Sequence, residues 1–380
     1  MECFGRVSQG RRSIVHCIPS MGGGGAERQL AYLAGELTRL GWEVHVALLS
    51  DGANGERLKA GGAVVHRMTA AGHHDPRIFG HLLRIIHAVR PDLVQTWFVQ
   101  MEVMGGMAAR MMRVPWILSE RSSELAYPGT LKNRLRARLA SGASAIVANS
   151  SGGDQYWQAR VASRIPRHVV PNAVPIEEIA GARPLGREDT GLEPDDDVIL
   201  YVGRFSPEKN LEVLVAALEV ALSRPRTVAV LCGEGPLRAT VERWLRERGI
   251  ADRVRLLGYA PAVWGWMKRA AVLVSPSIFE GRPNVVLEAM ACGCPLVASD
   301  IPAHREFLDD GSALLVKPDL PTALADAIVS VLSLREAAGR RADRARAKAA
   351  EWSVPAIGRQ YDRIYRDVLA GGARSGRRAG

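Results

Sequence analysis

Two glutamates with a fixed spacing are the residues of this sequence that point most directly to chemistry. Glu280 and Glu288 flank seven residues in FEGRPNVVLEAMACGCPLVAS, which opens with Gly, Arg and Pro and closes in an apolar strand. A helix that begins near Asn284 would offer the N–H groups of its first turn to a phosphate. Glu288, about one turn into that helix, can accept hydrogen bonds from the vicinal hydroxyls of a ribose. Glu280 would lie near a sugar attached to the phosphate, although either acid alone is more typical of a solvated surface.

Two cations precede this stretch in the segment YVGRFSPEKNLEVLVAAL. Arg204 and Lys209 follow a predicted strand and precede a predicted helix. A guanidinium offers a planar fork of donors and an ammonium offers a point charge, so together they suit a diphosphate. Each cation alone is more often a surface residue, but the pair of glutamates favours the functional interpretation.

A run of four glycines in SMGGGGAERQL lies between the first predicted strand and the first predicted helix. Glycines there let the backbone approach a ligand, and the amino end of the helix attracts anions. No Gly-Lys-Ser/Thr follows, and the spacing of a dinucleotide fingerprint cannot be laid on the run. A plain tight turn is the alternative, which we consider less favoured at the carboxyl end of a parallel strand.

Short apolar strands alternate with amphipathic helices along nearly the whole chain. Such repetition predicts parallel sheets covered on both faces. The predicted strands span residues 13–19, 43–50, 62–68, 91–97, 114–120, 143–150, 167–173, 197–203, 227–233, 254–259, 271–277, 294–299 and 313–318. Apolar residues at helical spacing predict helices near residues 26–37, 78–89, 102–112, 322–334, 335–350 and 352–369.

The alternation breaks once, in a segment rich in Pro, Gly and acids at residues 171–197. We interpret this segment as an interdomain linker and surface loop. The sequence then predicts a domain over 1–175, on which a last helix (352–370) packs back, and a second domain over 176–351. The basic end GGARSGRRAG, residues 371–380, is predicted to be a disordered tail. Two doubly wound domains in tandem predict a ligand crevice at the carboxyl ends of both sheets.

Composition bounds the class of protein. The 380 residues exceed the size of a single core, and 47% hydrophobic with 24% charged residues is typical of a globular chain. No apolar run reaches the roughly 18 residues of a membrane span, and the five cysteines lack zinc spacing, so we expect a cytoplasmic protein with reduced thiols. The net charge of +10 is compatible with anionic substrates, an anionic membrane or nucleic acid.

Four segments together resemble a known family. GGGGAERQLAYLA, GRFSPEKNL, CGEGPLR and EGRPNVVLEAMACGCPLVASD are similar to motifs of the retaining glycosyltransferases of family 4, which have the GT-B fold. The resemblance covers nearly the whole chain, and the pair of glutamates in its full context is the most specific part. It implies two Rossmann-like α/β domains that face a central cleft, with the last helix crossing back to the first domain. The acceptor is expected on the N-terminal domain and a nucleoside-diphosphate-sugar on the C-terminal domain.

The resemblance also assigns roles to the matching positions. Arg204 and Lys209 match the diphosphate pair, Glu288 the ribose ligand and Glu280 the donor-sugar contact, so Glu280, Arg204 and Lys209 are the candidate catalytic residues. The other implied donor-binding residues are Gly23, Gly24, Gly25, Glu234, Gly281, Arg282, Pro283, Asn284 and Val285, the first three in a loop that closes on the donor phosphates. The resemblance implies no metal or cofactor, because in the family cations and a helix terminus stabilise the leaving group.

One position departs from the family pattern. Related chains often carry a His that faces the donor sugar a few residues after the strand that ends in QTW, and this chain has Gln100 there. A glutamine can bond a hydroxyl but cannot act as an acid or become cationic. Glu120 and Arg121, in SERSSELAY, match a family segment at the cleft and are candidate acceptor contacts, with a structural ion pair as the equal alternative.

The resemblance implies a hexosyltransferase that moves a sugar to a carbohydrate or lipid-linked acceptor in cell-surface polysaccharide, glycolipid or related glycoconjugate synthesis. A nucleotide-sugar epimerase or a weakly active nucleotide-binding member of the same fold remains an alternative. A phosphorylase would be larger and carry a pyridoxal lysine. Nucleic-acid binding would gather the cations on one face beside aromatic residues, so no nucleic-acid partner is expected.

A basic stretch suggests peripheral contact with an anionic membrane. In LKNRLRARLA, leucines recur every four residues, with Lys132, Arg134, Arg136 and Arg138 beside them. A helix of this kind can lie on an anionic bilayer. The alternative, which we favour, is a leucine stripe that faces the core with the arginines in solvent.

Overall fold

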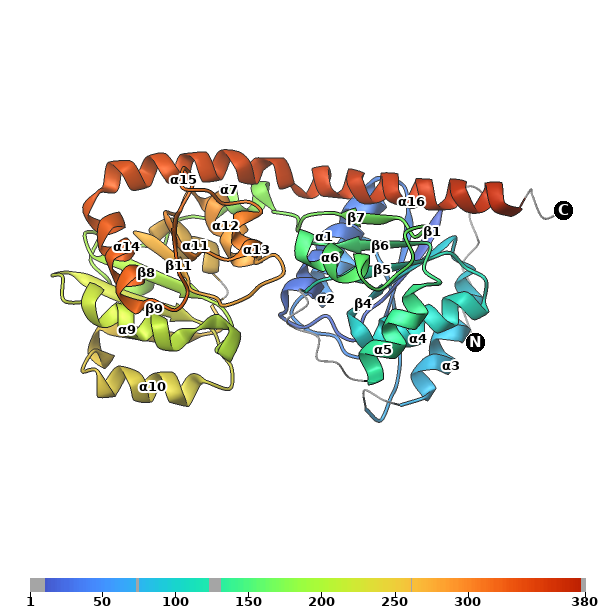
Figure 1. The fold of residues 1–380 in the computed structure, drawn as a ribbon, viewed down its shortest axis with the longest axis horizontal. Coiled ribbons are helices and arrows are strands. Elements are labelled where there is room, and N and C mark those ends of the chain that lie inside the picture. The colour runs from blue at the N-terminus through green and yellow to red at the C-terminus, as the bar shows by residue number, and fades with distance from the viewer. Residues whose placement is uncertain (1–10, 73–74, 123–130, 261, 377–380) are drawn as a thin grey trace. The chain divides into compact units, whose positions relative to one another are not determined.

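The computed structural model describes residues 11–72, 75–122, 131–260 and 262–376. The chain divides into two compact units (Figure 1). Unit 1 holds the chain up to Ala173 together with the C-terminal segment from Val354, and unit 2 runs from Val174 to Ser353. The predicted boundaries at 175/176 and 351/352 lie two residues from these points.

Unit 1 is built on a seven-stranded parallel sheet in the order β3-β2-β1-β4-β5-β6-β7. Its strands are β1 (Ser13–Cys17), β2 (Glu43–Leu48), β3 (Val64–Arg67), β4 (Leu93–Trp97), β5 (Trp116–Glu120), β6 (Ala145–Ala148) and β7 (Arg167–Val169). Its helices are α1 (Gly25–Arg39), α2 (Gly55–Ala60), α3 (Arg77–Val89), α4 (Phe98–Met111), α5 (Leu131–Ala140), α6 (Ser151–Gln158) and α16 (Val354–Gly376). Every residue of the central strands β1, β4 and β5 is buried, as expected for a sheet with helices on both faces.

The last helix, α16, is anchored to unit 1 by close packing on α1. A Cβ added at Gly358 would lie 2.2 Å from Cγ of Glu36 on α1, so only a glycine permits this approach. The indole Nε1 of Trp42 donates to Oδ1 of Asp362 at 2.8 Å, and the hydroxyl of Tyr365 donates to Gln95 on β4. The predicted return of the last helix to the first domain is thus explained by specific contacts within unit 1.

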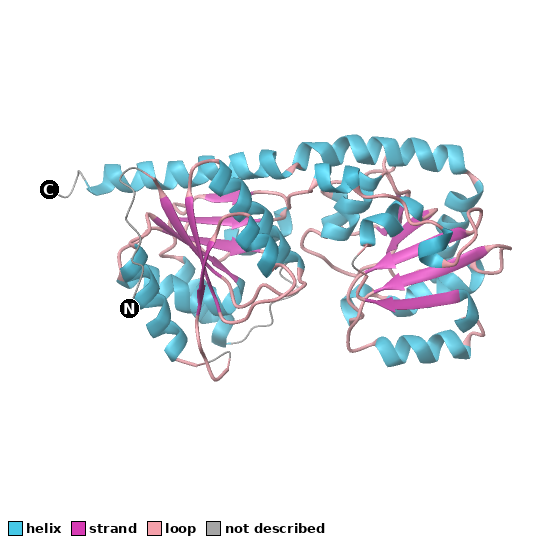
Figure 2. Cartoon of the chain, turned by 180° about the vertical axis from the view of Figure 1, so that it is seen from behind, coloured by secondary structure: helices cyan, strands magenta, loops and turns pink. Residues whose placement is uncertain are grey.

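Unit 2 is built on a six-stranded parallel sheet in the order β10-β9-β8-β11-β12-β13. Its strands are β8 (Asp197–Val202), β9 (Thr227–Cys232), β10 (Val254–Gly258), β11 (Val272–Ser275), β12 (Leu296–Ser299) and β13 (Leu314–Val316). Its helices are α7 (Ile176–Gly181), α8 (Arg187–Thr190), η2 (Pro207–Lys209), α9 (Leu211–Ala221), α10 (Arg238–Glu247), η3 (Ala251–Arg253), α11 (Val263–Arg269), α12 (Asn284–Cys292), α13 (Pro302–Arg305), α14 (Pro321–Ser333), α15 (Arg335–Ala349) and η4 (Ala350–Trp352). Figure 2 shows both sheets in magenta with helices against them.

All thirteen predicted strands are present, and the predicted α/β class with two doubly wound sheets is confirmed. The linker prediction for 171–197 is wrong beyond Ala173, because Val174, Ile179 and Leu192 are buried in the core of unit 2 and α7 and α8 form there. The predicted disordered tail is wrong for residues 371–376, which continue α16. A glycine pair lowers helix propensity, but extending an existing helix costs far less than nucleating one. Residues 377–380 lie outside the described part of the chain.

The strand order reverses once in each sheet, between β1 and β4 in unit 1 and between β8 and β11 in unit 2. In open parallel sheets, ligands generally bind at the carboxyl edge where the strand order reverses. In unit 2, the β8 loop carries Arg204 and Lys209, and the β11 loop carries Glu280. In unit 1, the four-glycine run follows β1 and Gln100 follows β4. The fold therefore brings these residues to the two switch points, whereas Glu234 follows β9 and Glu120 and Arg121 lie at the end of β5.

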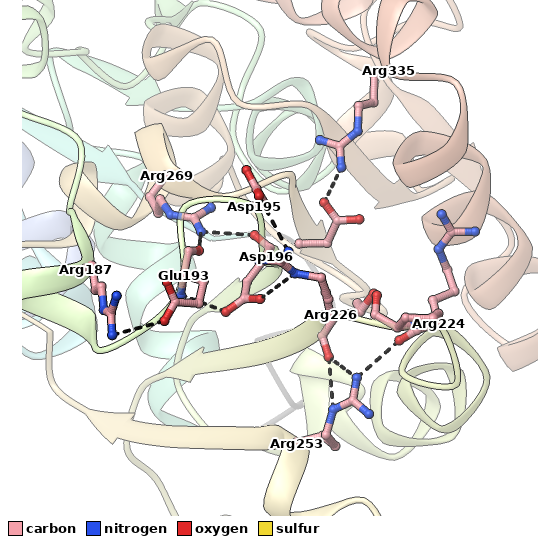
Figure 3. A network of polar contacts seen from close by, with 12 residues as sticks. Arg187, Glu193, Asp195, Asp196, Arg224, Arg226, Arg253, Arg269 and Arg335 are labelled. Carbon is pink, nitrogen blue, oxygen red and sulfur yellow. Dashed lines mark hydrogen bonds and ion pairs between the residues drawn. The ribbon is translucent and has the colours of Figure 1, made fainter.

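The opposite, amino edge of the second sheet is closed by arginines (Figure 3). Arg253 donates to the carbonyls of Thr227 (2.7 Å) and Arg224 (3.2 Å), and Arg269 donates to the carbonyls of Glu193 (2.7 Å) and Asp196 (3.0 Å). Arg226 pairs with Asp195 and Asp196, and Arg335 with Asp197 at the start of β8. These guanidinium groups bond backbone oxygens and carboxylates that lie at or just before the starts of the strands. Their role is therefore structural.

A buried histidine makes the free energy of unfolding depend on pH. His16 on β1 is fully buried, its Nδ1 accepts from Nε1 of Trp97 at 3.2 Å, and burial lowers its pKa to about 3. The unfolded chain has an ordinary histidine pKa near 6.5. Between these values the unfolded state binds one more proton, so stability is present above about pH 6.5 and is lost as the pH falls. Burial also lowers the pKa of His45, His66, His168 and His304 in the same direction.

We expect urea unfolding, followed by circular dichroism between pH 7.5 and 4.5, to show stability falling with pH. His16→Gln should flatten the profile by up to about 1.4 kcal/mol per pH unit, because one titrating group is removed. His87→Gln, at an exposed position of α3, is the matched control and should leave the slope unchanged. Parallel profiles for the wild-type protein and His16→Gln would contradict this account.

Candidate functional site

The two loops at the second switch point are fastened to each other. Asn210, which follows η2, donates through Nδ2 to the carbonyls of Pro276 (3.2 Å) and Pro318 (2.6 Å). The amide of Ile278 donates to the carbonyl of Glu208 at 2.9 Å. These bonds hold the loop after β8 against the loop after β11, so side chains on the two loops keep a fixed relation.

Lys209 and Glu280 form an ion pair across these loops. Nζ of Lys209 bonds Oε1 of Glu280, and the hydroxyl of Ser277 donates to the same oxygen at 2.8 Å. The Lys209 side chain is 21% exposed and that of Glu280 12%, so the pair is partly shielded and still open to a ligand. A shielded ammonium beside a carboxylate can meet a phosphate with one group and a sugar hydroxyl with the other.

Arg204 and Glu234 border this pair on neighbouring loops. Arg204 is exposed, and its backbone carbonyl accepts from the hydroxyl of Tyr201 at 3.1 Å. The loop after β9 lies tightly against the Arg204 loop, because a Cβ added at Gly233 would lie 1.8 Å from the carbonyl oxygen of Gly203. Glu234 on that loop is exposed and pairs with Arg238 at 2.7 Å.

Helix α12 begins at Asn284, directly after Pro283, at the carboxyl edge of the sheet. Val285 is its second residue and Glu288 its fifth, just over one turn along. Glu288 is only 3% exposed, and its Oε2 accepts from Nε1 of Trp264 at 2.9 Å. The helix is where the sequence predicted it, but the partner of its glutamate comes from α11, the helix before β11.

Arg282, another predicted donor-binding residue, also has a buried side chain. Its guanidinium carbon lies 4.7 Å from the ring centre of Trp352 and 5.1 Å from that of Phe307, and Nη1 lies 3.7 Å from Oε2 of Glu306. Burial lowers the pKa of Arg282 to about 10. The side chain therefore fastens the loop that contains Gly281 to the end of unit 2, which leaves the backbone of that loop for ligand contact.

His304 is a residue of this region that sequence reasoning missed. It is fully buried on α13, and its Nδ1–H donates to the carbonyl of Ser299 at 2.7 Å. Burial lowers the pKa of His304, and it is near enough to Glu280 and Lys209 to sense both charges. Ser277, Asn210 and Trp264 were missed as well. The signal available was their place after strands of the second sheet, on the carboxyl side, since single Ser, Asn, Trp and His residues form no motif.

The four-glycine run of unit 1 forms the turn into α1. Gly24 precedes the first helical residue, Gly25, and Gly23 is exposed. The side chain of Asn54 donates to the carbonyl of Gly22, and a Cβ added at Gly52 would lie 2.8 Å from Cα of Gly22. The run is thus held by the loop after β2, as a rigid turn with its glycines toward solvent.

Gln100 lies in the first turn of α4 and is 9% exposed. The turn is strained, because Phe98 adopts a φ of +66° that non-glycine residues rarely take. Such backbone strain is often found at functional sites, where the surrounding structure sustains it. Phe98 itself is 37% exposed at the end of the central strand β4.

Glu120 and Arg121 make structural contacts. Glu120 is fully buried and accepts from Nη2 of Arg136 (2.7 Å) and Nε1 of Trp157 (3.0 Å). The guanidinium of Arg121 stacks 4.4 Å from the ring centre of Trp97 and donates to Oδ1 of Asn172 at 3.3 Å. The expectation that Arg136 is a surface cation is wrong, because it is buried between Glu102 and Glu120, whereas Leu135 of the expected core stripe is 44% exposed. A buried carboxylate needs a partner of opposite charge. The helical periodicity of one segment does not reveal that its arginine is this partner for acids on other elements.

Two family models match the chain. The model of Glycosyltransferase Family 4 matches residues 23–178, and the model of Glycosyl transferases group 1 matches residues 183–348. The chain belongs to the GT4-type GT-B glycosyltransferases. The two matched segments fall one in each unit for nearly all their length, and the predicted family is confirmed.

Known glycosyltransferases are similar to parts of this GT4 chain. It is 34% identical over 187 residues to the alpha-D-kanosaminyltransferase of Streptomyces kanamyceticus, a match that covers 48% of each protein. It is 29% identical over 247 residues to the putative teichuronic acid biosynthesis glycosyltransferase TuaC of Bacillus subtilis, covering 63% of this chain and 60% of that protein. The chain spans about half to three fifths of the length of these relatives.

The fold also matches solved structures over almost its full length. The crystal structure of Anabaena HepE in complex with UDP and glucose superposes with a TM-score of 0.84 at 22% identity, covering 94% of this chain and 100% of that chain. Sucrose-phosphate synthase from Thermosynechococcus elongatus gives a TM-score of 0.77 at 22% identity, with 95% and 100% covered. At these identities the similarity establishes the GT-B fold.

The described residues contain neither a metal-binding cluster nor a membrane-spanning helix. No three His, Cys, Asp or Glu side chains of the described ranges gather in a way that could hold a metal ion. None of the described helices is long and apolar enough to cross a membrane.

Removal of either cation of the β8 loop should weaken binding of a nucleoside diphosphate. We expect Lys209→Ala and Arg204→Ala each to lose a charge-assisted contact worth roughly 1.5–3 kcal/mol. Isothermal calorimetry with UDP and GDP measures the loss. Arg226→Ala removes an exposed arginine of unit 2 at the amino edge and serves as the matched control. Unchanged affinity in both site variants would refute the diphosphate assignment.

Proposed function

We propose that this GT4 protein is a retaining glycosyltransferase that moves a sugar from a nucleoside-diphosphate-sugar to an acceptor hydroxyl. The observation that carries the proposal is the Lys209–Glu280 pair at the second switch point. In this pair, a cation suited to bind a diphosphate lies beside a carboxylate at the position where the donor sugar is expected. Both residues lie in the loops that carry the family motifs. The comparisons support a glycosyltransferase, and the donor and the stereochemistry are part of the proposal.

In this proposal the reaction needs no protein nucleophile. The bond between the sugar's anomeric carbon and the phosphate oxygen breaks while the acceptor oxygen bonds to the same carbon, on the face that the nucleotide leaves. The acceptor proton passes to the departing phosphate. Arg204, Lys209 and the amino end of α12 stabilise the negative charge of the leaving diphosphate, so no metal is required.

The remaining residues hold the donor. Glu280 accepts hydrogen bonds from the hydroxyls of the donor sugar, and Glu288 accepts them from the hydroxyls of the ribose. The backbone of the loop that contains Gly281 faces the phosphates, while the Arg282 side chain holds that loop in place. Gly23, Gly24 and Gly25 belong to unit 1, and their closing on the donor phosphates stays a prediction, as does an interaction of Gln100 with the sugar.

The names of the relatives suggest the acceptor class. Besides TuaC, the chain is 32% identical over 186 residues to a Campylobacter jejuni enzyme named as a 4-alpha-N-acetylgalactosaminyltransferase that acts on a diphospho-undecaprenol-linked sugar. HepE was crystallised with UDP. We therefore propose a carbohydrate or lipid-linked acceptor in cell-surface glycan synthesis and a uridine nucleotide as the first donor to test.

Substitution of the two glutamates should separate nucleotide binding from sugar transfer. Glu288→Ala should weaken UDP binding, because the ribose contact is lost, whereas Glu280→Ala should mainly lower turnover of the intact nucleotide-sugar by roughly ten-fold or more. A panel of UDP-sugars with lipid-linked and carbohydrate acceptors, analysed by mass spectrometry and NMR of the product anomer, measures both. Activity should persist in EDTA.

Three results of this experiment would change the proposal. Equal loss of UDP affinity in both variants contradicts the division of roles between the glutamates. An inverted anomer contradicts retention. Epimerisation of the nucleotide-sugar without an acceptor would favour the alternative of an epimerase.

We propose that unit 1 also contacts an anionic membrane through the layer formed by α3, α4 and α5. In that layer α4 packs against both neighbours. Among the described side chains its exposed cations are Arg77, Arg84, Arg90, Arg110, Arg113, Arg134 and Arg138, and its exposed apolar residues include Met107, Met111 and Leu135. The acids within α3, α4, α5, β4 and β5 are the buried Glu102 and Glu120. Just outside these elements, Asp92 accepts from the backbone N–H of Ser13, and Asp75 pairs with Arg77. The excess of positive charge suits anionic lipid.

Vesicle co-sedimentation checks this surface. We expect binding to anionic vesicles at low salt that fades at high salt, because each cation contributes about 1 kcal/mol near the surface. The triple variant Arg110→Gln, Arg134→Gln, Arg138→Gln should lose most of it. The matched control replaces Arg335, Arg340 and Arg344 on α15 of unit 2, an equal change of charge. Equal sedimentation of the triple variant and the parent would exclude this layer as the contact.

A further inference from the structure

Trp264 and Glu288 are joined across two adjacent helices at the edge of the proposed donor site. Trp264 is the second residue of α11 and Glu288 the fifth of α12, the helices that precede and follow β11. In a parallel sheet both helices begin at the carboxyl edge, so both residues lie near the ligand side of the sheet. The indole Nε1 donates to Oε2 of Glu288 at 2.9 Å.

The hydrogen bond from Trp264 restrains the orientation of the Glu288 carboxylate. Glu288 is 3% exposed, and a charge so far from water interacts strongly with any donor that reaches it. A carboxylate accepts from two vicinal hydroxyls only when its plane is turned toward them. A hydrogen-bond donor that holds one carboxylate oxygen therefore determines whether the carboxylate is oriented to bind the two ribose hydroxyls.

The indole is itself held firmly. The thiol of Cys292, one turn beyond Glu288 on α12, approaches the Trp264 carbonyl at 3.9 Å. A Cβ added at the next residue, Gly265, would lie 2.9 Å from Cγ of Leu185, so α11 is pressed against the segment before α8. The Trp264 ring packs against the same apolar core as Met267. The donor N–H thus comes from a rigid support.

We propose that Trp264 is a positioning residue that orients Glu288 and thereby makes the nucleotide site selective for ribose over 2′-deoxyribose. The inference rests on the proposed function, in which Glu288 receives the ribose hydroxyls. Trp264 acts through Glu288 and touches neither the diphosphate nor the transferred sugar. Its loss should therefore change how the site discriminates between sugars of the nucleotide and leave the diphosphate contacts of Lys209 intact.

The test compares ribose and deoxyribose nucleotides on the full chain by isothermal calorimetry. UDP, GDP and ADP are each paired with the 2′-deoxy form, and the pair whose ribose member binds the wild-type protein best is used further, with inorganic pyrophosphate as a probe of the diphosphate contacts. Trp264→Phe keeps an aromatic ring and removes the N–H. We expect it to reduce the preference for ribose by roughly ten-fold, close to the effect of Glu288→Ala, with pyrophosphate affinity unchanged.

Trp266→Phe is the matched control. Trp266 stands on the same helix, is 7% exposed and packs in the apolar core of unit 2, so its variant should keep the ribose preference. Thermal unfolding confirms that each variant is folded. Trp264→Leu replaces Trp264→Phe if the latter does not fold. The double variant Trp264→Phe, Glu288→Ala should behave as Glu288→Ala alone, since Trp264 acts only through that carboxylate.

The outcomes separate the two claims. If Glu288→Ala abolishes the preference and Trp264→Phe leaves it intact, the positioning role is refuted and the proposed function stands. If Glu288→Ala has no effect on the preference, the ribose assignment fails and the inference fails with it. Absence of binding by every nucleotide of the panel refutes both. A loss of pyrophosphate affinity in Trp264→Phe would show a general disturbance of the site and overturn the inference.

Discussion

The parallel arrangement of the strands is the constraint on which the rest of this structure depends. Because every strand of a sheet runs in one direction, each strand-to-helix loop of that sheet leaves from the same edge. Helices on both faces and a single reversal of strand order then separate two of those loops. Polar side chains of different loops therefore lie close together at this edge. Lys209 bonds Glu280 although 71 positions separate them in the sequence.

The two edges of the second sheet illustrate a division between function and stability. At the carboxyl edge, Arg204 and the Lys209–Glu280 pair remain within reach of a ligand. At the amino edge, Arg253 and Arg269 donate hydrogen bonds to backbone carbonyls (Figure 3). Arginine is thus left exposed at one edge and bonded to the protein's own backbone at the other.

Aromatic side chains support the charged residues of both units. Arg282 lies between two rings, Arg121 stacks on Trp97, and the indole of Trp264 holds Glu288. A ring supplies an apolar wall and, in tryptophan, a single fixed donor, so it positions a charge without neutralising it. This arrangement holds a buried or half-buried charged group in one orientation and leaves its charge unpaired by the ring.

The sequence by itself determined the strand pattern, the two-domain α/β class and the place of the glutamate pair and its two cations. These properties follow from local periodicity and from short motifs, which neighbouring residues carry. Only the tertiary structure decided that Arg282 and Arg136 are buried, that 174–197 packs in unit 2 and that Trp264 holds Glu288. Burial and partnership depend on which elements meet, and residues distant in sequence meet only once the chain has folded.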